Sequence, residues 1–493
     1  MARAGWLVTV LEKQATAGGR ARQHKEAGFV FDMGPSWYWM PGVFERFFNC
    51  FGKKVSDYYT LDRLDPSYRV YWPDGPMDIP ADYDALQQLF ESIEPGSAAK
   101  LDSFMREALY KYEVGINKLV HKPGQSYAEF LDWDLVKGIF KLDVFTSMKK
   151  HISKHFKNPK LQQLLEFPVL FLGALPEDTP ALYSLMNYAD IKLGTWYPQG
   201  GMYKIVEGMV SVAEELGVKF VFNSDVTEIK VEGGQAKAVM AQEAVEPQYT
   251  AADGQQATDN EQQTTTSQYD ADVVIGAADY HFIETKLLPQ NYRSYSDAYW
   301  DKRVMAPSCL LYYVGLNKKL DSILHHSLFF DTDFDIHGKE IYVSKKWPGD
   351  PLFYVCTPSV TDGSVAPDGQ ENMFFLIPVA TGLQGDTEEL RNAYFDKILE
   401  RFEKYSGQKL RESIIFKKTY SVSNFVNDYN SFKGNAYGLA NTLMQTANLK
   451  PACRSIKIKN LFYTGQLTVP GPGVPPSLIS GEVVAKEATR HFG

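Results

Sequence analysis

The chain has 493 residues with 51 Lys or Arg and 60 Asp or Glu, so its formal net charge is −9 at pH 7. A chain this acidic is a poor candidate for a nucleic-acid-binding protein. Hydrophobic residues make up 44% of the sequence and the mean hydropathy is −0.29, which excludes a disordered chain and a polytopic membrane protein.

The sequence shows neither a signal peptide nor an apolar run of about 18 residues, the length of a membrane span. A cytoplasmic location is therefore expected. The cysteines are too far apart for a zinc ribbon or a CxxC redox site, and no metal site is predicted; they are Cys50, Cys309, Cys356 and Cys453. No Ser/His/Asp set or carboxylate pair stands out, so the catalytic residues stay unknown.

The N-terminus predicts the tail of a helix, closed by Gly5, and then a short buried strand that ends at Glu12. In a dinucleotide-binding unit, such an acidic residue accepts hydrogen bonds from the ribose, roughly 20 residues after a GxGxxG turn. That turn does not precede Glu12 in this sequence. We therefore expect a first strand, the turn and most of a helix to be missing upstream, through a mis-called start or a deletion in a damaged copy.

Residues 13–45 are rich in loop signals. Gly18 and Gly19 would let the backbone approach a pyrophosphate closely, and Arg20 would supply a cation. Further on, residues 68–72 and 77–79 predict a hairpin, and residues 81–165 are mostly helical.

Residues 137–160 carry seven lysines against one acid, Asp143. Phe145, Met148, Ile152 and Phe156 recur at helical spacing within this stretch. Two interpretations stay open: an amphipathic helix packed on the core, and a helix that lies on a membrane surface.

The middle of the chain predicts alternating helices and strands. A helix over residues 202–216 precedes a strand at 219–222, and residues 225–231 and 236–240 predict a strand pair. Residues 241–270 are rich in Gln and acids, and we expect a disordered insertion there. A buried strand over 271–278 then leads to Asp279, a predicted helix N-cap.

The last third predicts a mixed sheet and two helices. The β-rich segments are 307–316, 341–345, 352–356 and 373–380, and a helix follows over 387–404. A short strand at 461–463 then enters a Pro/Gly-rich segment before a last helix over 478–490. The N-terminus of such a helix offers free N–H groups and a positive dipole end.

Five blocks together resemble the phytoene desaturase family of carotenoid biosynthesis, within the amine-oxidase-like flavoproteins. They are Val8–Lys13 with Gly18–Ala21, Phe31–Ser36, Trp196–Met202, Ala277–Asp279, and Tyr463–Gly465 through Pro470–Pro475. They follow the family's order over nearly the whole chain.

The resemblance implies an α/β fold: a Rossmann-like FAD-binding domain, truncated at its N-terminus, interleaved with a mixed-sheet and helical substrate domain. The FAD-binding parts would be residues 1–80, 196–300 and 456–493. The substrate parts would be the helical, membrane-associated residues 81–195 and the mixed-sheet residues 301–455. The implied FAD contacts are Glu12 at the ribose, Gly18, Gly19 and Arg20 at the pyrophosphate, Gly34, Pro35 and Ser36 near the flavin, Val226 at the adenine, and Gly465, Gly473 and Val474 at the flavin edge.

The implied reaction is desaturation of an acyclic C40 precursor such as phytoene, by hydride transfer to the flavin. It would need a long apolar polyene, a membrane surface with which the protein associates peripherally, and an electron acceptor such as a quinone or oxygen. Residues 167–175, a continuous apolar run, are the candidate lining of a substrate tunnel. The alternatives are a carotenoid isomerase, ketolase or hydroxycarotenoid desaturase, a soluble flavin amine oxidase, and an inactive truncated flavoprotein.

Overall fold

The computed structural model describes residues 1–126, 129, 142–170, 173–244 and 264–493. Its strands are β1 (Thr9–Leu11), β2 (Gln23–Glu26), β3 (Phe29–Asp32), β4 (Leu61–Arg63), β5 (Tyr68–Trp72), β6 (Gly75–Ile79), β7 (Trp196–Pro198), β8 (Lys219–Val221), β9 (Ser224–Glu232), β10 (Gln235–Ala244), β11 (Thr264–Asp270), β12 (Val274–Gly276), β13 (Ser308–Leu316), β14 (His326–Phe329), β15 (Phe353–Cys356), β16 (Glu371–Val379), β17 (Ile414–Tyr420) and β18 (Leu461–Tyr463).

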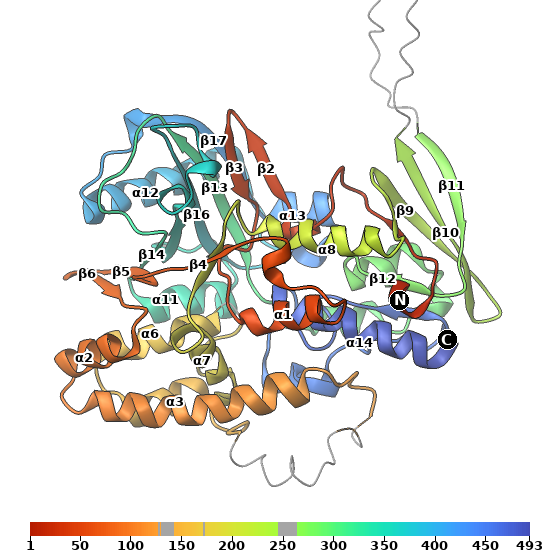
Figure 1. Ribbon diagram of the computed structural model, residues 1–493, viewed down its shortest axis with the longest axis horizontal. Helices are drawn as coiled ribbons and strands as arrows, with labels where there is room; N and C mark the ends of the chain where they lie inside the picture. Colours follow the sequence, from red (N-terminus) through yellow and green to blue (C-terminus); the bar gives the residue numbers. More distant parts are fainter. Residues whose placement is uncertain (127–128, 130–141, 171–172, 245–263) are drawn as a thin grey trace, which may run out of the picture.

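Its helices are α1 (Pro41–Asn49), α2 (Tyr83–Ile93), α3 (Ser97–Val114), α5 (Met148–His155), α6 (Pro159–Leu170), α7 (Leu185–Ile191), α8 (Tyr203–Glu215), α9 (Tyr280–Phe282), α10 (Asp297–Asp301), α11 (Phe334–Lys339), α12 (Glu388–Ser406), α13 (Val422–Tyr429) and α14 (Val474–Phe492). The elements form two halves (Figure 1): β13–β17 and α12 lie in one, and both termini lie with β9–β12 in the other.

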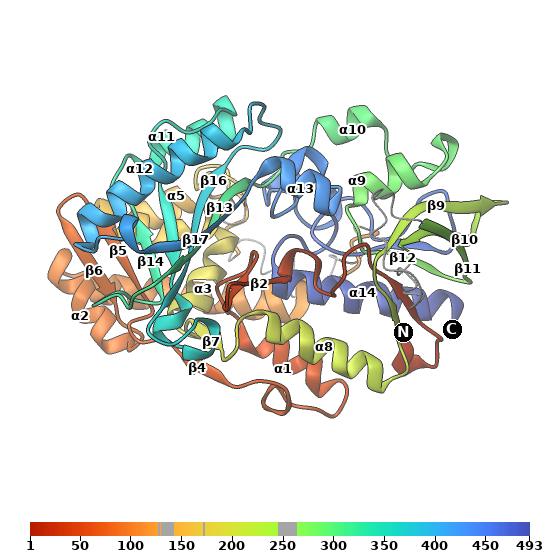
Figure 2. The same ribbon diagram turned by 90° about the horizontal axis from the view of Figure 1, so that it is seen from above.

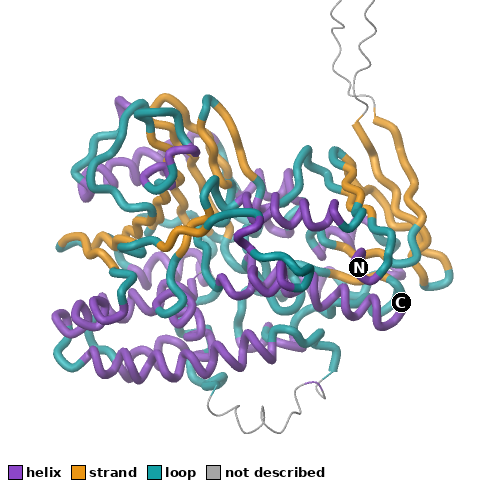
Figure 3. The backbone as a smooth tube through the Cα atoms, in the orientation of Figure 1, coloured by secondary structure: helices purple, strands orange, loops and turns teal. Residues whose placement is uncertain are grey.

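A seven-stranded sheet in the order β17-β13-β16-β15-β14-β5-β6 organises the first half. β14 pairs with β5 in parallel and the other neighbours are antiparallel, so the predicted mixed sheet is confirmed. Successive side chains of a strand point to opposite faces. Tyr312 therefore packs in the cluster with α12, whereas Tyr313 packs in the cluster that includes the helices α2 to α7. Figure 3 shows α2 and α3 as the lower edge of this half.

Helix α7 is tied to the sheet by a buried carboxylate. Asp190 accepts hydrogen bonds from the Tyr68 hydroxyl of β5 at 2.9 Å and from Thr195 Oγ1 at 3.2 Å. Burial raises the pKa of Asp190 to about 7. Asp190 thus links this helix to the sheet inside a largely apolar cluster.

The second half contains two parallel pairs, β1 with β8 and β12 with β18, and the three-stranded sheet β11-β10-β9. The predicted strand before Glu12 exists, but the prediction that it is buried is wrong. Among the described residues β1 is hydrogen-bonded to β8 alone, so Leu7 is fully exposed and Val10 is 37% exposed.

Three further expectations about secondary structure need correction, and one of them lies partly outside the described residues. At both ends of the expected disordered insertion the chain is ordered: residues 241–244 complete β10, and residues 264–270 form β11, because this Thr-rich segment pairs with the edge of β10. Residues 245–263 lie outside the described residues. Residues 340–344 are helical and not a strand, because they continue the turns of α11. The last helix begins at Val474, four residues before the expected start.

The two halves interleave along the chain. β5 and β6 belong to the seven-stranded sheet although they lie in residues 1–80, which we assign to the FAD-binding domain. Viewed from above, α8, α1 and α14 run along the same side of the molecule (Figure 2), although they come from three separate parts of the sequence. The proposed domain boundaries stay a prediction.

The lysine-rich stretch is described from residue 142 onward. Met148, Ile152 and Phe156 are fully buried in the core, whereas Phe145 is 80% exposed. Lys149 forms an ion pair with Asp335 at 3.0 Å and is half-buried, whereas Lys150 and Lys154 are exposed. The apolar stripe of this segment therefore packs on the core. No helix in the described parts of the chain is long and apolar enough to cross a membrane.

Candidate functional site

The end of β1 brings Glu12 to the start of β9. The Glu12 carbonyl accepts a hydrogen bond from Ser224 N at 2.9 Å, and Val226 lies two residues further along β9. The Glu12 carboxylate accepts from Gln14 N at 2.8 Å, and burial raises its pKa. Glu12 and Val226, predicted to meet the adenosine part of the cofactor, therefore lie in one region.

Two glycines of the predicted site, Gly18 and Gly34, lie in close contact with other segments. A Cβ atom on Gly18, whose φ is +112°, would lie 3.2 Å from the Tyr203 ring of α8. A Cβ atom on Gly34 would lie 2.6 Å from the Arg20 carbonyl oxygen. Only residues without a side chain fit at both positions. The segments around residues 18–20 and 34–36, separate in the sequence prediction, are in backbone contact.

The strand before Gly34 also positions α8. The Asp32 carboxylate accepts hydrogen bonds from Met202 N at 2.6 Å and Tyr203 N at 3.0 Å, at the first turn of that helix. Burial raises the pKa of Asp32 to about 7. The Phe31–Ser36 and Trp196–Met202 blocks thus meet at this carboxylate.

Arg20 is enclosed by groups distant in the sequence. Its guanidinium lies 5.2 Å from the centre of the Tyr429 ring, and Nη2 donates to the Asn435 carbonyl at 3.3 Å. With its amide oxygen turned toward the guanidinium, Gln466 accepts from Nη1 at 2.6 Å. Burial lowers the pKa of Arg20, and the Asp279 carboxylate opposes that shift. Arg20 Nε is buried without a partner.

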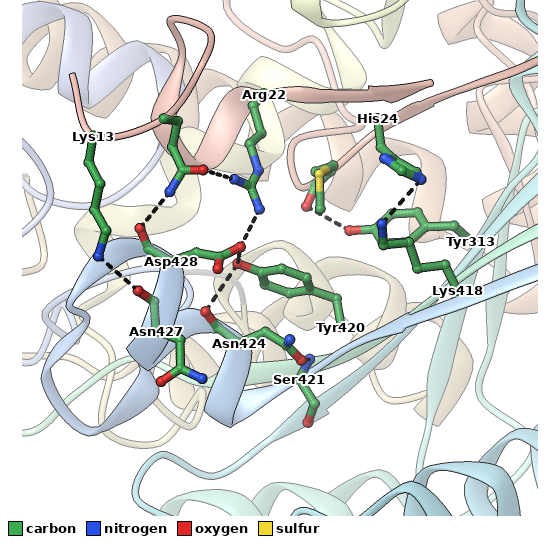
Figure 4. Close-up of polar contacts among 12 residues, drawn as sticks. Lys13, Arg22, His24, Tyr313, Lys418, Tyr420, Ser421, Asn424, Asn427 and Asp428 are labelled. Atoms are coloured by element: carbon green, nitrogen blue, oxygen red, sulfur yellow. Dashed lines mark hydrogen bonds and ion pairs between the residues drawn. The ribbon is translucent and has the colours of Figure 1, made fainter. Parts of the chain in front are cut away.

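A second arginine ties the same segment to α13, as Figure 4 shows. Arg22 donates to Gln14 Oε1 at 2.7 Å and forms an ion pair with Asp428, whose carboxylate also accepts from the Tyr420 hydroxyl at 2.9 Å. Lys13 Nζ donates to the Asn427 carbonyl at 3.2 Å. No motif in the sequence indicated the contacts of Arg22 with Asp428 and of Lys13 with Asn427, whose partners lie 406 and 414 positions apart.

The C-terminal segment joins the site after β18. Thr464 N donates to the Gly276 carbonyl at 3.0 Å, and Gly465 N donates to Ser480 Oγ of α14 at 3.1 Å. Gly473, with φ +114°, is the N-cap of α14, and no side chain caps that helix. Val474 is its first residue, followed by two prolines that have no N–H group.

Ser36 lies against the seven-stranded sheet. Its hydroxyl accepts a hydrogen bond from the Tyr354 hydroxyl at 3.0 Å, and Pro35 beside it is half-buried. The next residue, Trp37, stacks on His326 with a ring separation of 4.0 Å and lies 6.0 Å from the Phe167 ring. Phe167 begins the apolar run proposed as a tunnel lining, of which residues 171–172 lie outside the described residues. Ser36, which is predicted to lie near the flavin, thus adjoins an aromatic region.

The residues present fit a dinucleotide cofactor. Arg20 Nε and Thr464 Oγ1 are buried polar atoms that find no partner in the part of the chain that the structure describes, and they lie on the segments predicted to hold the pyrophosphate and the flavin. Gly19 and Gly465 have open space where a Cβ atom would lie, and the uncapped start of α14 supplies a positive dipole end. Arg20, Gly34 and the Gly465 segment converge; Glu12 and Val226 form the other end of the site.

Comparison with known proteins identifies the family. The family model for flavin-containing amine oxidoreductases matches residues 1–489. The chain belongs to this family. It is therefore an FAD-dependent oxidoreductase, and the expected FAD and α/β fold are confirmed.

Relatives of this flavin amine oxidoreductase confirm the resemblance to phytoene desaturases. The carotenoid 3,4-desaturase of Haloarcula japonica is 41% identical over 488 residues, which cover 99% of this chain and 94% of the relative. The 4,4'-diapophytoene desaturase of Staphylococcus haemolyticus is 30% identical, covering 99% and 94%. The zeta-carotene-forming phytoene desaturase of Myxococcus xanthus is 28% identical, covering 99% and 90%.

Solved structures support the fold alone. A putrescine oxidase variant matches with a TM-score of 0.60 at 12% identity, covering 99% of this chain and 94% of that one. An oxidoreductase from Methanosarcina mazei matches with a TM-score of 0.58 at 14% identity, covering 98% and 95%.

Proposed function

We propose that this flavin amine oxidoreductase desaturates a long carotenoid precursor. The observation that carries the proposal is the 41% identity over 99% of the chain to a protein named as a carotenoid 3,4-desaturase. Two substrates follow: phytoene, as the sequence motifs imply, and a more conjugated carotenoid that is desaturated at its 3,4 bond, as the name of this relative suggests. In both, two hydrogens leave adjacent carbons, one as a hydride and one as a proton, and a single bond becomes a double bond.

FAD, when bound, supplies the hydride acceptor. Glu12 would hold the ribose and Gly18, Gly19 and Arg20 the pyrophosphate, while Gly34, Pro35, Ser36, Gly465, Gly473 and Val474 would surround the flavin and Val226 the adenine. The uncapped start of α14 would favour negative charge at the flavin edge. A quinone or oxygen would take the electrons onward.

The aromatic region beside Ser36 supports an apolar substrate. Trp37, Phe167 and Tyr354 form part of one buried cluster between the seven-stranded sheet and the helices. A hydrocarbon offers no hydrogen-bond partner, so its position must come from apolar contact, worth about 25 cal/mol per Å² buried. This region would exclude water from the reacting carbons and orient the chain beside the flavin.

An enzyme that acts on such a substrate must reach a membrane surface. We propose that exposed lysines bind the protein to this surface. Lys150, Lys154 and Lys157 are exposed on and after α5, near the exposed ring of Phe145. Lysines near an anionic surface contribute about 1 kcal/mol each.

The test uses the full chain loaded with FAD and vesicles that contain either phytoene or a carotenoid with a saturated 3,4 bond. Each new conjugated double bond moves the absorption of the product to longer wavelength, and chromatography separates the products. Conversion of either carotenoid supports the proposal and decides between the two substrates. Turnover of a soluble primary amine with neither carotenoid converted would overturn it in favour of an amine oxidase, and FAD binding with no turnover of any of them would indicate an inactive flavoprotein.

A further inference from the structure

Three buried donor side chains meet on the seven-stranded sheet, beside Ser36, which is one of the predicted FAD contacts. His326 begins β14 and pairs directly with Cys356, the last residue of β15, in the antiparallel register; His325 precedes His326. One nitrogen of each histidine and the Cys356 sulfur lie within 4.8 Å of one another. His326 is fully buried, and His325 and Cys356 are each 5% exposed.

Both histidines present an unused nitrogen. Nε2 of His325 and Nε2 of His326 are buried and have no hydrogen-bond partner among the described residues. Nδ1 of His325 lies 2.9 Å from Thr361 Oγ1, and Nδ1 of His326 lies 2.7 Å from the Tyr354 hydroxyl. Buried polar atoms normally find a partner, so two adjacent orphans need an explanation.

The hydrogen bonds around Tyr354 assign the tautomer of His326. Tyr354 has one hydroxyl proton, which it donates to Ser36 Oγ at 3.0 Å. Its oxygen therefore accepts from Nδ1–H of His326, and Nε2 of His326 carries the lone pair. Metal-bound histidines typically show this arrangement, in which an outer partner holds one nitrogen and the other binds the ion.

The surrounding charges favour a cation. The Asp32 side chain lines the same cavity as His325 and Cys356, where a carboxylate favours a bound cation. A coordinated cation deprotonates a thiol, and the released proton goes to solvent.

We propose that His325 Nε2, His326 Nε2 and Cys356 Sγ bind one zinc ion. Two imidazoles and a thiolate are the donors that Zn²⁺ prefers, and a tetrahedral ion would keep its fourth position open. That position would face the cavity of about 20 Å³ lined by His325, Cys356, Ser36 and Tyr197, which has room for a single water molecule.

A second cluster in the described chain lacks these features. Glu107, His151 and His155 also lie within 4.8 Å of one another, but Glu107 is exposed. The buried Lys111 places its Nζ 3.3 Å from His151 Nε2, where its charge repels a cation. The β14–β15 site is therefore the one that we assign.

The experiment loads the full chain with Co²⁺ in place of zinc and records thiolate-to-cobalt charge transfer in the near ultraviolet. A Cys50→Ser background removes the exposed thiol. We expect one Co²⁺ per chain, displaced by Zn²⁺, and loss of the band in Cys356→Ser. The matched control is Cys309→Ser, since Cys309 is a buried cysteine of the same core cluster and lies outside the site; it should keep the band.

Two further variants keep the proposal falsifiable if Cys356→Ser does not fold. Tyr354→Phe removes the partner of His326 Nδ1 and should weaken Co²⁺ binding by about 10–100-fold, the usual effect of losing an outer partner. His325→Gln should weaken it by at least about tenfold, because it removes a ligand at similar volume. Absence of a charge-transfer band in the parent, a band that survives Cys356→Ser, or unchanged affinity in both other variants would overturn the proposal.

Discussion

The contact between Gly34 and the backbone of Arg20 offers a quantitative test of the candidate site. In Gly34→Ala, the new Cβ would lie 2.6 Å from the Arg20 carbonyl oxygen. Ordinary contacts of this kind begin near 3.4 Å, so the two segments must separate by about 0.8 Å, the difference between these distances. Overpacking of this kind usually costs about 1–3 kcal/mol. Both segments are predicted to hold FAD, so the same displacement should weaken cofactor binding.

The assay compares urea unfolding and FAD titration of Gly34→Ala with those of a matched control, Gly42→Ala. Gly42 lies in α1, and a Cβ atom there meets nothing within 4 Å. The control should stay within about 0.5 kcal/mol of the parent, because Gly42 is exposed in the first turn of α1 and its new methyl group meets no neighbour. Gly34→Ala should instead lose stability and FAD affinity together. A Gly34→Ala protein as stable as the parent would refute the packing argument, and lower stability with unchanged FAD affinity would refute the placement of the cofactor.

Glu12→Gln should keep the fold but weaken FAD binding by about 1–2 kcal/mol, the scale of a charge-assisted hydrogen bond; unchanged affinity in a titration would show that the ribose lies elsewhere. Changing Lys150, Lys154 and Lys157 to Gln should weaken binding to anionic vesicles, measured by sedimentation, by about 1 kcal/mol per lysine, while the amount of bound flavin stays constant. Equal sedimentation of variant and parent would show that these lysines do not contact the membrane. The pKa of Asp190 is about 7 in the folded state and 3.8 in the unfolded state, so the folded state keeps the proton up to higher pH. The free energy of unfolding therefore falls as the pH rises between these two pKa values, by up to about 4 kcal/mol. Asp190→Asn should flatten this part of the stability profile, and a parallel profile for the two proteins would contradict the assignment.

Much of the local structure could be predicted from the sequence because it depends on near neighbours. The helix before Gly217, the hairpin at residues 68–79 and the Asp279 cap follow from side-chain periodicity and turn chemistry within a few positions. The motifs that indicate FAD are local as well, since a glycine that must approach a phosphate or a backbone closely is recognisable where it stands. The family, the cofactor and the mixed sheet were therefore within reach of the sequence by itself.

Only the tertiary structure shows the contacts between segments that lie far apart in the chain. The helical spacing of Met148 and Ile152 fits a membrane-surface helix and a core helix equally well. Only the packing of the folded chain shows that both side chains are buried. β1 has the composition of a buried strand, yet it stays partly exposed because burial depends on what covers it. The convergence of Gln466 and Tyr429 on Arg20, and of Cys356 on His326, has no local signature. Spacing along the sequence specifies the element in which a side chain lies, whereas the side chain's partners depend on how the elements pack.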